Sequence, residues 1–181
     1  GMNRYGVILD NVGLDLALTG LVENYIRPLA GTFFPEFIGE QDAAEKYAFT
    51  VRYESDGDVE LAKHGDASVA TLNVCLGQPG WKGGDLEFFE YSASGIYQLP
   101  KGSSAGAGRI AFRPGLAVLH RGQHKHQALR LQSGVRTNLI IWLFARHGVV
   151  RVAPYRPSEQ LSSHQQWQPK LLEGAQSFSG F

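Results

Sequence analysis

Cysteine is nearly absent from this sequence, and so is any long hydrophobic run. The single cysteine, Cys75, has no partner for an internal disulfide, so the sequence predicts a reducing compartment, with the cytoplasm as the expected location. No apolar run reaches the roughly 18 residues that a membrane-spanning helix needs. The first residues lack the basic-then-apolar pattern of a secretory signal, and Gly1 before Met2 is typical of an expression remnant.

An excess of charge of either sign is also missing. The chain has 17 basic and 17 acidic residues, which gives a net charge of zero with neutral histidines. A nucleic-acid-binding domain usually clusters Lys and Arg, so neither nucleic acid nor a membrane is expected as a partner. The 181 residues, 43% of them hydrophobic, suit one domain over 1–181. We expect a core at about 47–145, helical support at 3–40 and a tail at 154–181.

Glycine, by contrast, is abundant, and the 22 glycines separate short β-like runs. One helix is predicted over residues 14–29, with Pro28 expected to kink or end it. Its apolar stripe, expected to pack against a sheet, consists of Leu14, Leu18, Leu21, Val22, Tyr25 and Leu29. Strands are predicted over residues 47–54, 69–76, 84–89, 109–113, 116–120, 126–131 and 137–144, with Ser133-Gly134 as a hairpin turn.

One helix followed by about eight short strands is typical of a mainly β, α+β protein with a double-stranded β-helix. This cupin-like jelly roll is the predicted fold, and an ordinary antiparallel sandwich is the alternative. Residues 101–108, rich in Gly, Ser and Ala, predict a connecting loop, with a substrate lid as the functional alternative. Residues 154–181 are polar and predict a short helix or a loosely docked tail.

A His-x-Asp pattern opens the functional argument. In an extended chain, residues two apart face the same side, so His64 and Asp66 can reach one ion together. Two imidazoles and one carboxylate form the facial triad of non-haem iron(II) oxygenases, which leaves positions open for a 2-oxo acid and dioxygen. A solvated loop pair is the ordinary alternative for so short a pattern.

The second histidine of such a triad has to come from a distant strand. His120, His124 and His126 cluster in the sequence and share the same parity, so spacing alone leaves the choice among them open. Some of them would then simply line a strand end.

Arg136 adds a possible anion partner across the hairpin turn. It follows His126 by ten residues, and its planar guanidinium suits a carboxylate such as the distal one of 2-oxoglutarate. An arginine on this apolar strand would be costly to bury without an anion. A surface arginine at a strand start is the alternative.

Taken together, these segments resemble the iron- and 2-oxoglutarate-dependent protein hydroxylases. The likeness is to the catalytic domain of procollagen lysyl hydroxylases and to related oxygenase-domain proteins, and more distantly to prolyl 4-hydroxylases. It runs from about Tyr47 to Phe144, with a weaker likeness of Asn3 to Val7 to the oxygenase-domain proteins. The residues that carry it are Phe49-Thr50-Val51-Arg52-Tyr53, His64-Gly65-Asp66-Ala67-Ser68, Thr71-Leu72-Asn73-Val74-Cys75-Leu76, Gly83-Gly84, Leu119-His120-Arg121-Gly122, His126 and Arg136.

The resemblance implies a role for each matching residue. His64, Asp66 and His126 match the iron ligands, which are also the catalytic centre, and Arg136 matches the partner of the distal carboxylate. Tyr53 and Asn73 match positions that help to hold 2-oxoglutarate. His120 matches a family histidine that does not bind iron, although the lysyl hydroxylases have one residue more before the iron histidine. Cys75 stands where oxygen-sensing prolyl hydroxylases have a tyrosine, which disfavours a prolyl substrate slightly.

The activity implied by the resemblance is hydroxylation of an unactivated C–H, coupled to conversion of 2-oxoglutarate to succinate and carbon dioxide. The implied cofactors are iron(II), 2-oxoglutarate as co-substrate and ascorbate as reductant, with dioxygen as second co-substrate. Trp142 and Leu86 are expected to wall the pocket. We expect a lysine or proline side chain of a protein or peptide as substrate. The alternatives are a free amino acid or other small metabolite, and a non-catalytic jelly-roll binding module.

Overall fold

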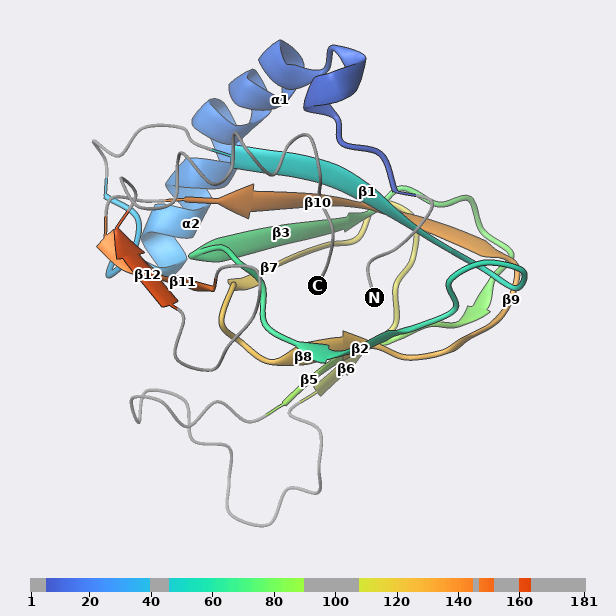
Figure 1. The fold of residues 1–181 in the computed structure, drawn as a ribbon. Coiled ribbons are helices and arrows are strands. Elements are labelled where there is room, and N and C mark those ends of the chain that lie inside the picture. Colours follow the sequence, from blue (N-terminus) through green and yellow to red (C-terminus); the bar gives the residue numbers. More distant parts are fainter. Residues whose placement is uncertain (1–5, 40–45, 90–107, 145–146, 152–159, 164–181) are drawn as a thin grey trace.

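A nearly continuous helical segment leads into the strands of this protein. The computed structural model describes residues 6–39, 46–89, 108–144, 147–151 and 160–163 (Figure 1). Within them, the helical segment consists of a 3-10 turn η1 (Asp10–Val12), α1 (Asp15–Leu21), a π turn η2 (Val22–Ile26) and α2 (Arg27–Phe33). In this part of the chain, no helix is long and apolar enough to cross a membrane.

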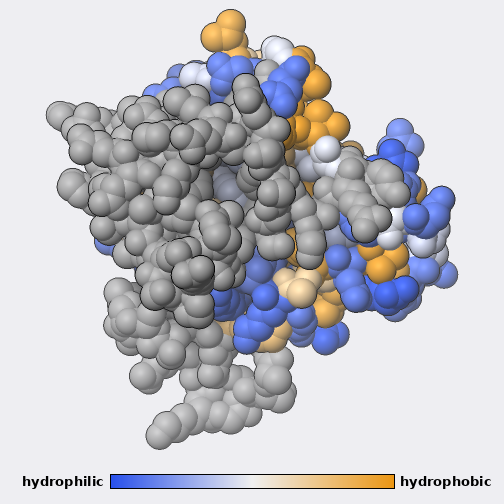
Figure 2. Space-filling model, in the orientation of Figure 1, coloured by the Kyte–Doolittle hydropathy of each residue, from blue (hydrophilic) through white to orange (hydrophobic). Residues whose placement is uncertain are grey.

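The buried face of the helix differs from the predicted stripe. Its buried apolar residues are Leu18, Val22, Ile26 and Ala30, whereas four members of the predicted stripe are exposed, namely Leu14, Leu21, Tyr25 and Leu29. The helix carries two apolar faces, and the predicted stripe combined residues from both of them. The face with the smaller side chains packs against the major sheet, because Ala30 and Val22 allow a close approach. The other face contributes to the apolar surface at the top of Figure 2.

The helix does not end at Pro28, which was one of the two outcomes expected for this residue. The π turn η2 ends at Ile26, and the backbone N–H of Arg27 donates to the carbonyl of Val22. Pro28 therefore occupies one of the first positions of α2, where a missing backbone N–H costs little. The helix continues past it to Phe33.

Two four-stranded antiparallel sheets lie face to face and form the body of the protein (Figure 1). The major sheet has the order β1 (Lys46–Glu54), β10 (Val135–Leu143), β3 (Ala70–Cys75) and β7 (Ala117–Arg121). The minor sheet has the order β2 (Leu61–His64), β8 (His126–Ala128), β5 (Leu86–Phe88) and β6 (Gly108–Ile110). Apart from β5 and β6, which pair with each other in the minor sheet, consecutive strands of these two sheets alternate between them. This arrangement is the double-stranded β-helix that the sequence predicts.

The strand β10 is buried on both faces, which explains why it is the most apolar run in the sequence. It lies between β1 and β3, in register from Lys46↔Leu143 to Glu54↔Val135 on one side. Ile141 and Leu143 on its outer face are fully buried under the helical segment. Arg136, Asn138 and Trp142 on its inner face line the space between the sheets.

Several strand boundaries differ from the prediction. The run over 126–131 is two strands, because the chain leaves β8 and forms β9 (Leu131–Ser133), which pairs with β4 (Lys82–Gly83). Strand β2 was not predicted, since its four residues show no apolar alternation. β11 (His147–Arg151) pairs with β12 (Gln160–Ser163), so residues 160–163 are neither helix nor loose tail. The rest of 154–181, and 101–107 of the predicted loop, lie outside the described residues.

Gly122 makes two backbone hydrogen bonds to the segment 66–69, which carries Asp66. Its carbonyl accepts the backbone N–H of Asp66 at 2.7 Å, and its own N–H donates to Val69. A Cβ built on Gly122 would collide with the backbone of Ser68. We expect Gly122→Ala to lower the free energy of unfolding by about 1–3 kcal/mol through overpacking. Denaturant unfolding measures it.

The matched control is Gly20→Ala in α1, where an added Cβ meets nothing within 4 Å. Because alanine is the better helix former, this variant should gain about 0.5–1 kcal/mol. Equal stabilities of the Gly122 variant and the wild type would show that the contact between Gly122 and Ser68 is not tightly packed.

Candidate metal centre and co-substrate cavity

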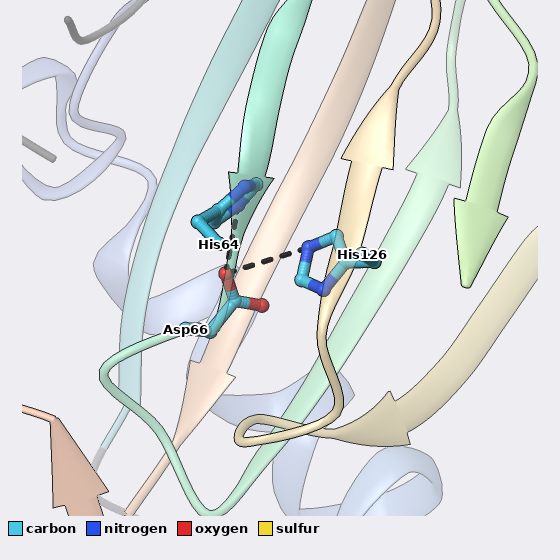
Figure 3. A group of neighbouring side chains, drawn as sticks. All are labelled: His64, Asp66 and His126. Atoms are coloured by element: carbon cyan, nitrogen blue, oxygen red, sulfur yellow. Dashed lines mark ion pairs between the residues drawn. The ribbon is translucent and has the colours of Figure 1, made fainter. Parts of the chain in front are cut away.

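Three potential ligands converge between the sheets (Figure 3). His64 ends β2 and His126 begins β8, and the two residues are direct partners across these strands. Asp66 follows β2 by two residues. Its Oδ1 lies 3.4 Å from Nε2 of His64 and 3.6 Å from Nε2 of His126. The ligand atoms of the three residues all lie within 4.8 Å of one another, so a single ion can contact all three.

Hydrogen bonds orient each of these side chains. Nδ1 of His64 donates to the carbonyl of Ala62 at 2.7 Å, and Nδ1 of His126 donates to the carbonyl of His124 at 2.8 Å. Both rings therefore present the lone pair of Nε2 toward Asp66. Oδ2 of Asp66 accepts a hydrogen bond from the Thr71 hydroxyl at 2.6 Å. Oδ1 thus remains directed at the histidines.

The surroundings favour the protonation states that bind a metal. Burial lowers the pKa of His126 to about 3, so its imidazole is neutral. Burial opposes ionisation of Asp66, but His126, His64 and His120 outweigh it and hold the pKa of this carboxyl well below its usual range. Two neutral imidazoles and one carboxylate suit a divalent transition metal such as iron(II), and they leave the remaining coordination positions to other ligands.

The lowered pKa of His126 predicts an acid-sensitive metal-free protein. Folding favours the neutral imidazole of His126, because its pKa is about 3 in the folded state, whereas the ordinary pKa of a histidine is 6.5. The free energy of unfolding should be highest above pH 6.5 and fall as the pH drops toward 3. Denaturant unfolding in chelator, compared between wild type and His126→Gln, measures this. If the free energy of unfolding depends on pH as strongly in His126→Gln as in the wild type, groups other than His126 cause the acid sensitivity.

His120 and His124 take different places from His126. His120 is 5% exposed and lines the cavity, with Nδ1 donating to Arg121 at 2.9 Å and Nε2 at 3.9 Å from Oδ2 of Asp66. His124 is half-buried, and its Nε2 donates to the carbonyl of Phe89 at 2.8 Å. Of these candidates from the sequence, the metal-ligand group formed with His64 and Asp66 includes His126 alone.

We expect the three histidines to respond differently to substitution. His126→Ala should lose bound iron, because it removes one of three protein ligands. His124→Ala and His120→Ala should retain iron, since their Nε2 atoms are outside the triad. Metal content after dialysis against a weak chelator measures this. Loss of iron from the His124 variant, with His126→Ala unaffected, would shift the ligand by two residues.

A cavity of about 540 Å³ connects the triad with Arg136. The guanidinium is 2% exposed, and its Nη1 donates to the carbonyl of Gly84. It lies 4.8 Å from the ring of Tyr53 and 5.1 Å from that of Phe112. Its Nε has no hydrogen-bond partner, and Asp85 is a nearby carboxylate that acts on its charge. A buried guanidinium with a spare donor is suited to an anionic ligand.

The two other predicted residues line the same cavity. Burial raises the pKa of Tyr53 to about 12, so its phenol remains a hydrogen-bond donor. The side-chain oxygen of Asn73 accepts a hydrogen bond from Asn138 at 2.7 Å. Trp142 and Leu86 also line it, as expected. Sequence reasoning missed Thr71 and Asn138, although their strand parity with Asn73 and Arg136 signals them, and it missed the wall formed by Gly6–Ile8.

The comparisons with known proteins find relatives that are named as 2-oxoglutarate- and iron-dependent oxygenases. A family model described as OGFOD2-like domain matches residues 1–39. A protein of Arabidopsis thaliana named 2-oxoglutarate and iron-dependent oxygenase domain-containing protein CP2 is 39% identical over 141 residues, which cover 78% of this chain and 35% of that protein. The chain resembles the iron- and 2-oxoglutarate-dependent oxygenases. This confirms the resemblance predicted from its motifs.

Other oxygenases share the likeness. The 2-oxoglutarate and iron-dependent oxygenase domain-containing protein 2 of Xenopus tropicalis is 39% identical, over 80% of this chain and 39% of its own length. Procollagen-lysine,2-oxoglutarate 5-dioxygenase 1 of Rattus norvegicus is 33% identical, over 64% of this chain and 14% of its own length. The chain thus spans well under half of these oxygenases, and its own activity, substrates and partners are matters of proposal.

A solved structure confirms the predicted fold. The non-haem α-ketoglutarate-dependent epimerase SnoN from nogalamycin biosynthesis aligns with a TM-score of 0.56 at 16% identity. The alignment covers 88% of this chain and 72% of SnoN. At such low identity the likeness concerns the fold alone, and it supports the double-stranded β-helix predicted for this oxygenase-like chain.

Proposed function

We propose that the chain is an iron(II)- and 2-oxoglutarate-dependent dioxygenase. It hydroxylates an unactivated C–H of a lysine or proline side chain in a protein or peptide. The observation that carries the proposal is a single cavity that contains the His64–Asp66–His126 group and, beyond it, the buried guanidinium of Arg136. The names of the relatives, which specify iron and 2-oxoglutarate, support it.

The three ligands would hold the iron on one side only. Oδ1 of Asp66 and the Nε2 atoms of both histidines already face one another, and the open side of the ion would face the cavity. When bound there, iron would supply the oxidation of a C–H bond by dioxygen at the expense of 2-oxoglutarate. Thr71 would keep Oδ2 of Asp66 occupied and the carboxylate in its ligand orientation.

The far end of the cavity would hold the co-substrate. Arg136 would pair with the distal carboxylate of 2-oxoglutarate through its guanidinium, and the protonated phenol of Tyr53 would donate a further hydrogen bond. Asn73 on β3 lines the same cavity and would contact the co-substrate. Leu86, Phe112 and Trp142 form apolar walls, which would exclude water from the reacting groups.

The name of one relative bears on the lysine or proline specificity. The rat relative is named for procollagen lysine, which favours a lysine side chain in a polypeptide. Location in the cytoplasm and ascorbate as reductant remain predictions of the sequence.

The test is incubation of a proteome digest with the protein, iron(II), 2-oxoglutarate and dioxygen. Succinate should form, and peptides should gain one oxygen atom on lysine or proline. A protein that binds iron fully but forms no succinate would be a binding module instead. Succinate formed only with free amino acids or metabolites would identify a small-molecule hydroxylase.

A further inference from the structure

The N-terminal segment from Gly6 to Leu9 extends the major sheet beyond β1. The N–H of Thr50 donates to the carbonyl of Val7 at 2.8 Å, and the N–H of Leu9 donates to Ala48 at 2.9 Å. Between these two bonds, Ile8 and Phe49 are partners in an antiparallel bridge. The outermost backbone of the major sheet on this side is therefore the segment 6–9.

This segment has a free edge. In an antiparallel ladder, a residue between two such bonds directs its own N–H and C=O away from the neighbouring strand. The N–H of Ile8 and the C=O of Gly6 therefore point outward. Among the hydrogen bonds of the described residues, none engages either group, and the carbonyl of Ile8 is taken by the N–H of Asn11 at 3.2 Å. A donor and an acceptor two residues apart are what an added strand requires.

The free edge borders the candidate active site. Gly6, Val7 and Ile8 line the same cavity as His64 and Asp66. Leu61 and His64 of β2 line it too, and β2 is the outermost strand of the minor sheet. The cavity is thus flanked by the outer edges of both sheets. Gly6 and Val7 are exposed, with Val7 at 45%, so their edge is accessible to a second chain.

We propose that the substrate binds as an extended peptide, pairing as an added strand with the free edge at Gly6 and Ile8. The inference rests on the proposed function and specifies its substrate class. Main-chain hydrogen bonds to Ile8 N–H and Gly6 C=O align the peptide, and side chains alternate between the two faces of the added strand. One of them enters the cavity and reaches toward the triad. Binding of this kind takes affinity from the main chain and specificity from one pocket.

Within the described residues, the edge of segment 6–9 is left uncovered beside the cavity, which is unusual for a β-sheet. Natural sheets usually cover or blunt an exposed edge, because it invites pairing with other chains. Here a glycine and an apolar residue leave the edge open beside the cavity. The OGFOD2-like match covers this segment, as it covers residues 1–39, so the feature belongs to the part of the chain that this family model describes.

The test uses the iron-loaded protein and a library of acetylated, amidated nine-residue peptides with central lysine or proline. Ile8→Pro removes the outward N–H, and Ile8→Val is the matched control that keeps it. For the best library peptide, Ile8→Pro should raise KM about tenfold, as expected for one lost hydrogen bond. Ile8→Val keeps the N–H and should raise KM far less than Ile8→Pro does. The affinity for 2-oxoglutarate, titrated without dioxygen, should be the same in all three proteins.

A scan of the peptide gives an independent measurement on the wild type. N-methylation of single backbone amides should weaken binding at every second position near the reacting residue and have little effect between them. If N-methylation is tolerated equally at every position, or if KM is unchanged in a folded Ile8→Pro variant, the peptide does not pair with the edge at Gly6 and Ile8. Hydroxylation of free lysine or proline in preference to every library peptide, while 2-oxoglutarate binds normally, leads to the same conclusion. Failure of the wild type to bind 2-oxoglutarate overturns the proposed function as well.

Discussion

Asp66→Asn should abolish iron binding and, with it, all turnover. The substitution keeps the size of the side chain and its contact with Thr71, but it removes the only anionic ligand of the group. Two neutral imidazoles hold a divalent ion far less tightly than two imidazoles and a carboxylate. We expect no stoichiometric iron after dialysis, where the wild type retains one ion. His64→Ala should give the same result.

The matched control is Asp56→Ala, because Asp56 is an exposed aspartate in the turn after β1. It should retain full metal content and activity, since exposed positions shift stability by less than about 0.5 kcal/mol. Metal analysis and cobalt(II) absorption, measured on the same preparations, report binding without relying on activity. Full iron occupancy in Asp66→Asn would remove this carboxylate from the site.

Arg136→Ala should raise the dissociation constant for 2-oxoglutarate by one to two orders of magnitude. A charge-assisted hydrogen bond to a carboxylate contributes about 1.5–3 kcal/mol, and about 1.4 kcal/mol corresponds to tenfold in affinity. Arg136 is 2% exposed, so solvent does not compete with the ligand for it. Arg136→Lys should recover only part of the loss, because an ammonium lacks the planar fork. Iron affinity should change little in either variant.

The control for Arg136 is Arg130→Ala. Arg130 lies four residues after His126 rather than ten, and its side chain is 67% exposed, with only a 3.9 Å contact to Glu60. Its removal should leave 2-oxoglutarate binding unchanged. Calorimetric titration of 2-oxoglutarate into the iron-loaded proteins compares the wild type with Arg136→Ala, Arg136→Lys and Arg130→Ala. If the wild type and Arg136→Ala bind 2-oxoglutarate with equal affinity, Arg136 is not the partner of its distal carboxylate.

The parts of the site that follow strand parity could be predicted from the sequence. His64 and Asp66 stand two residues apart at the end of an extended run, and Arg136 shares a face of β10 with Asn138 and Trp142. The choice of His126 over His120 could not be made from spacing, because all three histidines have one parity. It depends on His126 being paired directly with His64, which is a contact between distant parts of the chain.

Elsewhere, local patterns were insufficient because tertiary packing decided the outcome. The helix carries two apolar faces, and only the packing of Ala30 and Val22 against the sheet determines which one is buried. The π turn η2 could not be foreseen, and it is what allows Pro28 within the helical segment. The wall at Gly6–Ile8 has no sequence signal, since it arises from pairing with β1 about forty residues later in the chain.

Metal binding at the paired residues His64 and His126 would make the folding of the protein depend on its metal supply. Strand β2 has only four residues, a register irregularity and one neighbouring strand. An ion held by His64, Asp66 and His126 would act as a cross-link between β2 and β8, added to few backbone hydrogen bonds. A ligand that binds only the folded chain stabilises it by RT ln(1 + [L]/Kd). The free metal concentration would then set how often this corner of the barrel opens, and with it the lifetime of the chain against proteases.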